Sequence, residues 1–282
     1  MDDSGRRIRY DDLMRAPNRR PNLRRIRAEM DATSVRTWDN ALFAGGSGGI
    51  VFAASPGSVP EGRRVYAVGD VHGQLDKLRA IHAAIEADIA RRPVASVTLV
   101  HLGDFIDWGP DSAGVIAMLA SPPVLTTVNL AGDHEQMLLD ALDGDGAAAT
   151  DWLHSGGDAA LRSWGITPDT SRSEWRVRLP LDHLAFLRGL AHRHRIGGYL
   201  FVHAGVRPGV AIAEQSNMDL HHIREPFLST DRQFGPVVVH GHTVAGTPVV
   251  RSNRIGVDTG AGLGGKLSCA VLESDQVGFI SV

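Results

Sequence analysis

Aspartate and histidine recur along this chain at one kind of position, directly after a short apolar run. The runs at 65–68 and 97–102, for example, each lead into a Gly-Asp pair. A single Asp-x-His after a strand is most often a turn that faces water, but core packing does not explain five such segments. The residues concerned are Asp70, His72, Asp104, Asp107, Asp133, His134, His203, His240 and His242.

These side chains are of the types that bind divalent metals. Carboxylates and imidazoles together bind Mn²⁺, Fe or Zn²⁺ without any thiolate. Two such ions about 3.5–4 Å apart can clamp the attacking and leaving oxygens of a phosphoryl transfer. A two-metal site needs one shared ligand, and Asp104, in the middle of the set, is the candidate. The residues therefore predict a binuclear metal site suited to phosphoryl transfer.

Alternating strands and helices are expected to position these residues. Strand, loop and helix repeat three times, which is typical of βαβ units, and ligands bind where parallel strands end at a common edge. The stretch 145–195 is mostly helical in pattern and indicates a lid or insertion. The expected strands lie within 63–70, 96–104, 124–135, 198–205, 236–243 and 253–273, and the helices of the three units within 74–90, 110–120 and 135–142.

Length and composition allow one large α/β domain. The chain has 282 residues, of which 43% are hydrophobic and 22% charged, with a formal net charge of −3. This charge gives no reason to expect nucleic acid or a membrane as partner, and no apolar run is long enough to span a membrane. The single cysteine, Cys269, lies in an apolar run. It excludes a disulfide framework and favours a cytoplasmic location.

Residues 1–60 are expected to form an extension that precedes a catalytic domain at 61–282. Residues 1–30 hold nine arginines against five acids, and 42–62 are rich in Gly, Ser and Pro. A basic arm that docks an anionic partner is one interpretation of the first stretch. A solvated extension is the other, and we favour it because chain ends are commonly poorly ordered.

Five of the segments, taken in order, resemble a known family. GDVHG (69–73), GDFIDWGP (103–110), GDHE (132–135), HAG (203–205) and GHT (241–243) are similar to the motif series of the PPP-type phosphoprotein phosphatases. These are calcineurin-like metallophosphoesterases, and the bacterial serine/threonine phosphatases have the most similar form. The likeness covers residues 63–274. It implies an α/β fold, a four-layer α/β/β/α sandwich, in which a hydroxide bridging two metal ions attacks phosphorus.

The resemblance also implies a role for each matching position. His134 would be the general acid that protonates the leaving group, Asp107 would orient it, and Arg224 would contact the substrate phosphate. We expect two divalent metal ions, Mn²⁺ first, with Fe, Zn²⁺ or Ni²⁺ as alternatives. The ligands would be Asp70, His72 and Asp104 for one ion and Asp104, Asp133, His203 and His242 for the other, with His240 in a supporting or packing role.

Two positions depart from the family pattern. Trp108 stands where G-D-x-x-D-R-G has an arginine, and Asp133 stands where G-N-H-E has an asparagine. A charge-assisted hydrogen bond contributes about 1.5–3 kcal/mol, so losing the arginine would slow turnover roughly ten- to a hundred-fold. The indole either packs against an aromatic or alkyl part of the substrate or fills the vacated space. Both departures reduce attraction for a phosphate dianion and favour singly charged diesters.

The sequence therefore predicts a phosphoesterase that acts on phosphoserine and phosphothreonine, or on small phosphomonoesters and diesters. Two alternatives stay open. One is a dinucleoside polyphosphate hydrolase, because residues 103–112 share the frame G-D-x-x-x-x-G-P-D-S of the tetraphosphatases, which also keep the arginine. The other is a catalytically impaired protein that binds a phosphorylated partner. The intact pair of His134 and Asp107 favours an enzyme, because a binding protein has no use for an oriented general acid.

Overall fold

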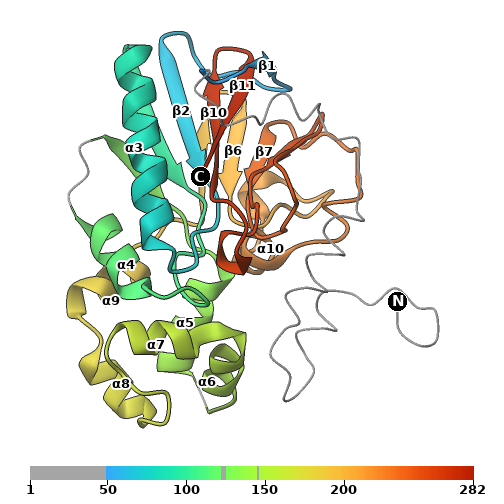
Figure 1. Cartoon of the computed structure of the whole chain (residues 1–282). Coiled ribbons are helices and arrows are strands. Elements are labelled where there is room, and N and C mark those ends of the chain that lie inside the picture. Colours follow the sequence, from blue (N-terminus) through green and yellow to red (C-terminus); the bar gives the residue numbers. More distant parts are fainter. Residues whose placement is uncertain (1–48, 122–124, 145) are drawn as a thin grey trace, which may run out of the picture. The chain divides into compact units, whose positions relative to one another are not determined.

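Two β-sheets packed face to face form the centre of the described domain in our computed structural model, which describes residues 49–121, 125–144 and 146–282 (Figure 1). The first sheet has the strand order β1-β11-β10-β2-β3-β4 and the second the order β5-β6-β7-β9-β8. The strands are β1 (Ala53–Ala54), β2 (Arg63–Val68), β3 (Ser96–His101), β4 (Thr126–Asn129), β5 (Arg193–Ile196), β6 (Tyr199–Val202), β7 (Val237–His240), β8 (Val249–Val250), β9 (Arg254–Gly256), β10 (Ser268–Glu273) and β11 (Gln276–Ser281).

Helices cover the outer faces of the sheets. Figure 1 shows α3 along the first sheet, with α6, α7 and α8 grouped together below it. α4 lies within the helix expected at 110–120, and Asp111 caps it by accepting the backbone N–H of Gly114 at 2.8 Å. The helices are α3 (Leu75–Arg91), α4 (Ser112–Ala120), α5 (Asp133–Asp143), α6 (Gly146–Trp152), the π-helical turn η2 (Leu153–Gly157), α7 (Asp158–Ser163), α8 (Arg172–Arg178), α9 (Leu181–Arg188) and α10 (Asn217–His222), with 3₁₀ turns η3 (Ile212–Glu214) and η4 (Ala261–Leu263).

Alternation along the strands divides the buried apolar residues into three cores. In β2, Tyr66 belongs to the core beneath α3 and α4, whereas Val65 belongs to the core between the sheets. In β6, Phe201 belongs to the core between the sheets, whereas Leu200 packs with Leu220 of α10 in a third core. Successive side chains of a strand point to opposite faces, so each sheet separates two cores. The three cores lie between four successive layers, which are helices, the first sheet, the second sheet and helices. This arrangement confirms the predicted α/β/β/α sandwich.

Parallel ladders bring the strand ends together. Val68 of β2 pairs with His101 of β3, which pairs with Asn129 of β4, so three loops leave the first sheet at one edge. In the second sheet β6, β7 and β9 are also parallel. The two edges meet, since Nδ1 of His203, just after β6, lies 2.9 Å from the carbonyl oxygen of Leu102, just after β3. The polar strand ends therefore come from two sheets rather than one.

The segment before β2 packs on the same domain. β1 pairs antiparallel with β11, and Val59 is buried between the sheets. Phe52 packs against the outer core beneath α3. The domain start expected at residue 61 thus falls within a packed segment, while the arginine-rich stretch 1–30 lies outside the described residues. Across the described ranges, no helix has the length and apolar character needed to cross a membrane.

Candidate metal centre

Five loops that follow β2, β3, β4, β6 and β7 supply the polar residues singled out in the sequence. Several of these residues have a left-handed backbone, with φ between 46° and 71°. Non-glycine residues adopt this conformation rarely, and Asp, Asn and His do so more often than most. The left-handed residues of the site are His72, Asp104, Asp107, Trp108 and His242.

Four expected ligands, with Asp133 among them, lie close together. Asp104, Asp133, His203 and His242 each offer one ligand atom, and these atoms all lie within 4.8 Å of one another. Oδ1 of Asp133 lies 2.9 Å from Nε2 of His203 and 3.1 Å from Nδ1 of His242. The set combines two carboxylates with two imidazoles, a donor set that several divalent metals accept.

A second group shares one member with the first. His72, Asp104 and His134 also offer ligand atoms within 4.8 Å of one another, so Asp104 belongs to both groups. Nε2 of His72 lies 3.5 Å from Oδ2 of Asp104, and Nε2 of His203 lies 3.4 Å from the same oxygen. One carboxylate oxygen thus stands between imidazoles from the two sheets, as a bridging ligand requires.

Asp70 is buried beside these groups but is not counted in either. Its Oδ2 accepts the backbone N–H of His242 at 2.9 Å, whereas its Oδ1 is buried without a hydrogen-bond partner among the described residues. A buried carboxylate oxygen without a partner is unfavourable unless a cation is present. Gly241 provides the necessary space, since a Cβ there would overlap Oδ1 of Asp70. The orphaned oxygen therefore fits a metal ion.

The electrostatics of the site also call for cations. Burial, together with the negative charges of neighbouring carboxylates, raises the pKa of Asp70 and of Asp104 well above the ordinary range. For Asp133, burial favours a higher pKa, but His242 and His203 outweigh it and the pKa is lowered. Asp258, a buried acid whose charge acts on Asp70, has a pKa raised to about 6, chiefly by burial. Divalent ions bound here would offset the repulsion between these neighbouring carboxylates.

His134 and Asp107 form a close pair at the edge of the metal groups. Nδ1 of His134 lies 2.7 Å from Oδ2 of Asp107, and the same oxygen accepts the indole N–H of Trp152 at 2.9 Å. Burial opposes the charged form of His134, but the hydrogen bond from its ring to Asp107 raises its pKa to about 9. Burial raises the pKa of Asp107 to about 6. At neutral pH the pair is an imidazolium held by a carboxylate, so His134 carries a proton to donate.

Trp108 lies flat against one expected ligand. Its ring stacks on that of His72 with centroids 4.9 Å apart and an angle of 10° between the planes. It meets His134 edge-on, at 5.6 Å and 88°. The indole Nε1–H donates to the carbonyl of Ser155 in η2. Gly156, with φ of 102°, is required beside it, because a Cβ there would overlap Cδ1 of Trp108. The indole thus links the helical insertion to the metal groups.

Glu135 is a buried residue that the sequence reasoning did not single out. Its Oε2 accepts the backbone N–H groups of Asp104 at 2.8 Å and Gly132 at 2.9 Å. Its Oε1 accepts those of Phe105 at 2.7 Å and Ile106 at 3.3 Å. One carboxylate therefore holds the loop that presents Asp104. The spacing G-x-x-E, in which the third helical residue bonds back to the N-cap, was the available signal.

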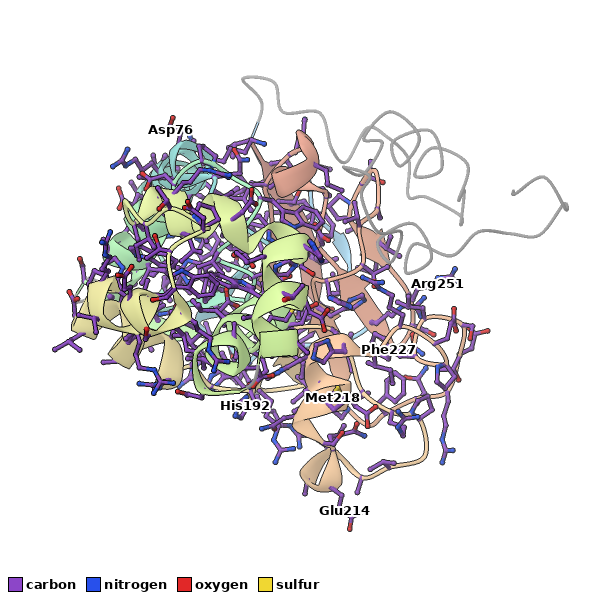
Figure 2. The ribbon with its side chains drawn as sticks, turned by 90° about the horizontal axis from the view of Figure 1, so that it is seen from below. Asp76, His192, Glu214, Met218, Phe227 and Arg251 are labelled. Carbon is purple, nitrogen blue, oxygen red and sulfur yellow. The ribbon has the colours of Figure 1, made fainter. Side chains whose placement is uncertain are left out.

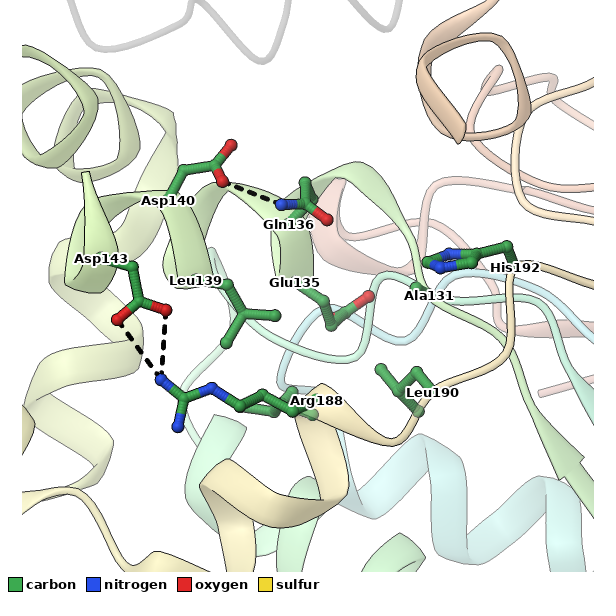
Figure 3. Close-up of a pocket in the computed structure, with 10 residues that line it drawn as sticks. Ala131, Glu135, Gln136, Leu139, Asp140, Asp143, Arg188, Leu190 and His192 are labelled. Carbon is green, nitrogen blue, oxygen red and sulfur yellow. Dashed lines mark hydrogen bonds and ion pairs between the residues drawn. The ribbon is translucent and has the colours of Figure 1, made fainter. Parts of the chain in front are cut away.

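Glu135 also lines a cavity of about 310 Å³ beside α5 (Figure 3). Figure 3 shows Leu139 and Leu190 among the residues that line it, together with the ion pair of Asp143 with Arg188, at 3.1 Å. None of the expected metal ligands lines this cavity. It is therefore a feature separate from the metal groups.

α10 approaches the site from the second sheet. Nδ1 of His222, its last residue, lies 3.8 Å from Oδ2 of Asp133, a proximity that no sequence pattern indicated. Burial lowers the pKa of His242 to about 4, and the positive charge of Arg224 acts in the same direction, which puts Arg224 near this ligand. The neighbouring His221 is buried and lies 3.1 Å from Nδ1 of His192. In Figure 2, seen from below, His192 and Met218 of α10 mark this region.

His240 turns away from the metal groups. Its Nδ1 lies 3.0 Å from the carbonyl oxygen of Gly241, and its ring packs edge-on against Phe227 with centroids 5.1 Å apart. Burial lowers its pKa to about 3, so the ring is neutral over the physiological range. These contacts are those of a packed core histidine.

Comparison with known proteins defines the class. Residues 63–261 match the model of the calcineurin-like phosphoesterases, and the chain belongs to this family of metal-dependent hydrolases. It is 30% identical over 220 residues to serine/threonine-protein phosphatase 1 of Salmonella typhimurium, covering 75% of this chain and 93% of that protein. Serine/threonine-protein phosphatase 2 of Escherichia coli is 29% identical over 223 residues, covering 73% and 91%. The resemblance read from the motifs is confirmed.

Solved structures extend the comparison. A crystal structure described as that of a proposed diadenosine tetraphosphatase aligns with a TM-score of 0.58 and 25% identity, covering 78% of this chain and 92% of that one. The fold of this chain is thus shared with a protein of that description.

Proposed function

We propose that this protein hydrolyses phosphate esters with two divalent metal ions, Mn²⁺ in the first place. Asp70, His72 and Asp104 would hold one ion, and Asp104, Asp133, His203 and His242 the other. The observation that carries the proposal is the position of Asp104 in both groups of ligand atoms, beside the pair of His134 and Asp107.

Two cations bound here would polarise the phosphoryl oxygens and lower the pKa of the attacking water. The chain itself supplies the proton for the leaving group. His134 is protonated at neutral pH, and Asp107 fixes its ring through Nδ1, so that Nε2 faces away from the carboxylate. Trp152 holds Asp107 from the other side. General acid catalysis of this kind contributes roughly 10²- to 10⁴-fold.

Phosphoserine, phosphothreonine and small phosphate esters form the substrate class we propose. The phosphatases of Salmonella and Escherichia coli support monoesters. Trp108 and Asp133 favour singly charged diesters within this class, because one brings no positive charge and the other adds a negative charge at the metal groups. Arg224 is the cation of the chain that we assign to the phosphate.

A second candidate is the hydrolysis of dinucleoside polyphosphates. The structural neighbour described as a proposed diadenosine tetraphosphatase favours it, together with the frame at residues 103–112. The cytoplasm is the compartment we propose, since the single cysteine, Cys269, excludes a disulfide framework. For the basic stretch 1–30 we retain the interpretation of a solvated extension, with docking of an anionic partner as the alternative.

The test measures turnover of p-nitrophenyl phosphate, bis-p-nitrophenyl phosphate and diadenosine tetraphosphate by Mn²⁺-loaded protein. The double variant Trp108→Arg with Asp133→Asn is assayed in parallel. We expect the wild type to cleave the diester at least as well as the monoester, and the double variant to gain monoesterase activity roughly ten- to a hundred-fold. Protein that binds Mn²⁺ but cleaves none of the three esters would refute the proposal and leave a binding protein.

A further inference from the structure

His222 occupies a distinctive place among the imidazoles around Asp133. The side chains of the four histidines in the two metal groups are at most 9% exposed, whereas that of His222 is 35% exposed. Its Nδ1 lies 3.8 Å from Oδ2 of Asp133, the oxygen that His203 and His242 leave unused. His222 is therefore the imidazole at the solvent side of this group.

The ring nitrogens of His222 have Oδ2 of Asp133 as a neighbour, at 3.8 Å. This distance exceeds the usual length of a hydrogen bond. The ring is not one of the residues in either metal group. A neutral imidazole always keeps one N–H, so His222 presents a donor beside Asp133.

Trp108, which lies against the second metal group, offers no free side-chain N–H to a substrate. It covers His72, and its one N–H is already donated to the carbonyl of Ser155. A phosphoryl group placed over the two metal groups therefore finds side-chain donors on the α10 side. Two lie there within three residues of sequence, His222 and Arg224, and the charge of Arg224 acts on both His222 and His242.

We infer that His222 is a substrate-binding residue that donates a hydrogen bond to a phosphoryl oxygen, beside Arg224. This inference rests on the proposed function, because it needs a phosphoryl group at the metal ions. It also explains how the site holds phosphate although Trp108 replaces an arginine. Two parts of the site then act differently, because α10 binds the phosphoryl oxygens while the pair of His134 and Asp107 protonates the leaving group.

The variants His222→Ala and His222→Gln test this role, since glutamine keeps an N–H donor and alanine removes it. His194→Ala is the matched control, because His194 is a half-buried histidine on β5 for which burial alone changes the pKa. The dissociation constant of inorganic phosphate is measured by calorimetry on Mn²⁺-loaded proteins. Manganese content and the kcat and KM for p-nitrophenyl phosphate are measured in parallel.

We expect His222→Ala to weaken phosphate binding and to raise KM about ten-fold or more. His222→Gln should recover part of this loss, and His194→Ala should match the wild type. Manganese content should be the same in all four proteins. Unchanged phosphate affinity in His222→Ala would overturn the inference, and so would the loss of one manganese ion, which would make His222 a ligand. Absence of turnover in the wild type would instead refute the proposed function.

Discussion

The two ends of strand β2 place buried charges in opposite situations. Near its amino end, Arg64 is 1% exposed and meets acids from two other elements. Beyond its carboxyl end, Asp70 is 2% exposed and meets other acids. The same six-residue strand thus links a region that neutralises its own charges to a region that does not.

Both acids that contact Arg64 at the amino end, Asp88 and Glu273, are paired with arginines of the chain. Arg64 donates to both carboxylate oxygens of Glu273, at 2.9 and 3.0 Å. Arg92 donates to both oxygens of Asp88, at 3.0 and 2.6 Å, and Tyr66 donates to the same carboxylate at 2.5 Å. Such a network is complete without any ligand, so its role is structural.

Asp70 and Asp104, at the carboxyl end, are in a different situation. Asp70 retains a buried oxygen without a hydrogen bond, and the pKa values of Asp70 and Asp104 are raised by burial and by like charges. The comparison teaches that burial alone does not mark a functional acid. What marks it is burial together with a missing cation, which must then come from outside the chain.

The largest effect should come from Asp104→Asn, which removes the carboxylate common to both metal groups. Because both ions depend on this residue, we expect kcat/KM to fall roughly a thousand-fold or more, with loss of bound manganese. Elemental analysis and turnover of phosphate esters check this. A variant that keeps two manganese ions and wild-type turnover would show that Asp104 does not bridge them.

His134→Gln should lower kcat roughly 10²- to 10⁴-fold while the protein keeps its manganese. The reason is that it removes the proton donor without removing an expected ligand. Asp107→Asn should give a smaller loss, because it leaves the imidazole in place but unsupported. Steady-state kinetics with manganese analysis distinguish the two effects. Loss of metal from His134→Gln would assign His134 to the ligands.

Arg64→Met should act on stability alone. Breaking a buried ion pair from one side costs about 3–5 kcal/mol of unfolding free energy, whereas turnover per folded molecule should not change. Urea denaturation measures the first quantity. Arg79→Met is the control, because its ion pair with Asp76 is exposed and should contribute little. Equal stability of the two variants would contradict the structural role of the buried network.

The pH dependence of stability should differ between the two regions. Hydrogen bonding to Arg64 lowers the pKa of Glu273, and its stabilisation is present above the unfolded value near 4.3 and lost as pH falls through the folded value. The raised pKa values of Asp70 and Asp104 act oppositely, so metal-free protein loses that stability as pH rises.

Added Mn²⁺ should therefore raise the melting temperature more at pH 8 than at pH 5, because metal binds deprotonated carboxylates. Thermal denaturation with and without Mn²⁺ at the two pH values measures this difference. An equal or larger increment at pH 5 would show that carboxylates such as Asp70 do not set the metal affinity.

The sequence alone predicted the strands and helices whose residue patterns are local. Apolar runs that end in Gly-Asp predicted β2 and β3, and the resemblance added the second sheet to the first. It did not reveal contacts between distant residues. Arg64 and Glu273 are 209 positions apart, and an arginine at a strand start is by itself an ordinary exposed residue. His222 was missed for the same reason, since the folding of α10 over Asp133 leaves no local pattern.

Trp108 shows a different limit of sequence reasoning. The sequence showed that Trp108 replaces an arginine. It also indicated two roles for the indole, which either packs against the substrate or fills the vacated space. The stack on His72 and the hydrogen bond to Ser155 depend on η2, whose sequence LHSGG carries no clear signal for a π-helical turn. Only the packing of the insertion on the strand-end loops identified the neighbours of the indole.

The left-handed backbone at His72, Asp104 and His242 has a consequence for how such chains diverge. Aspartate and histidine are among the few residues with a side chain that accept this conformation readily. A descendant that abandoned catalysis would therefore tend to retain these residue types, simply because the bends of its backbone favour them. The backbone conformation therefore favours these motifs independently of the chemistry. Their presence alone does not show that a relative is active.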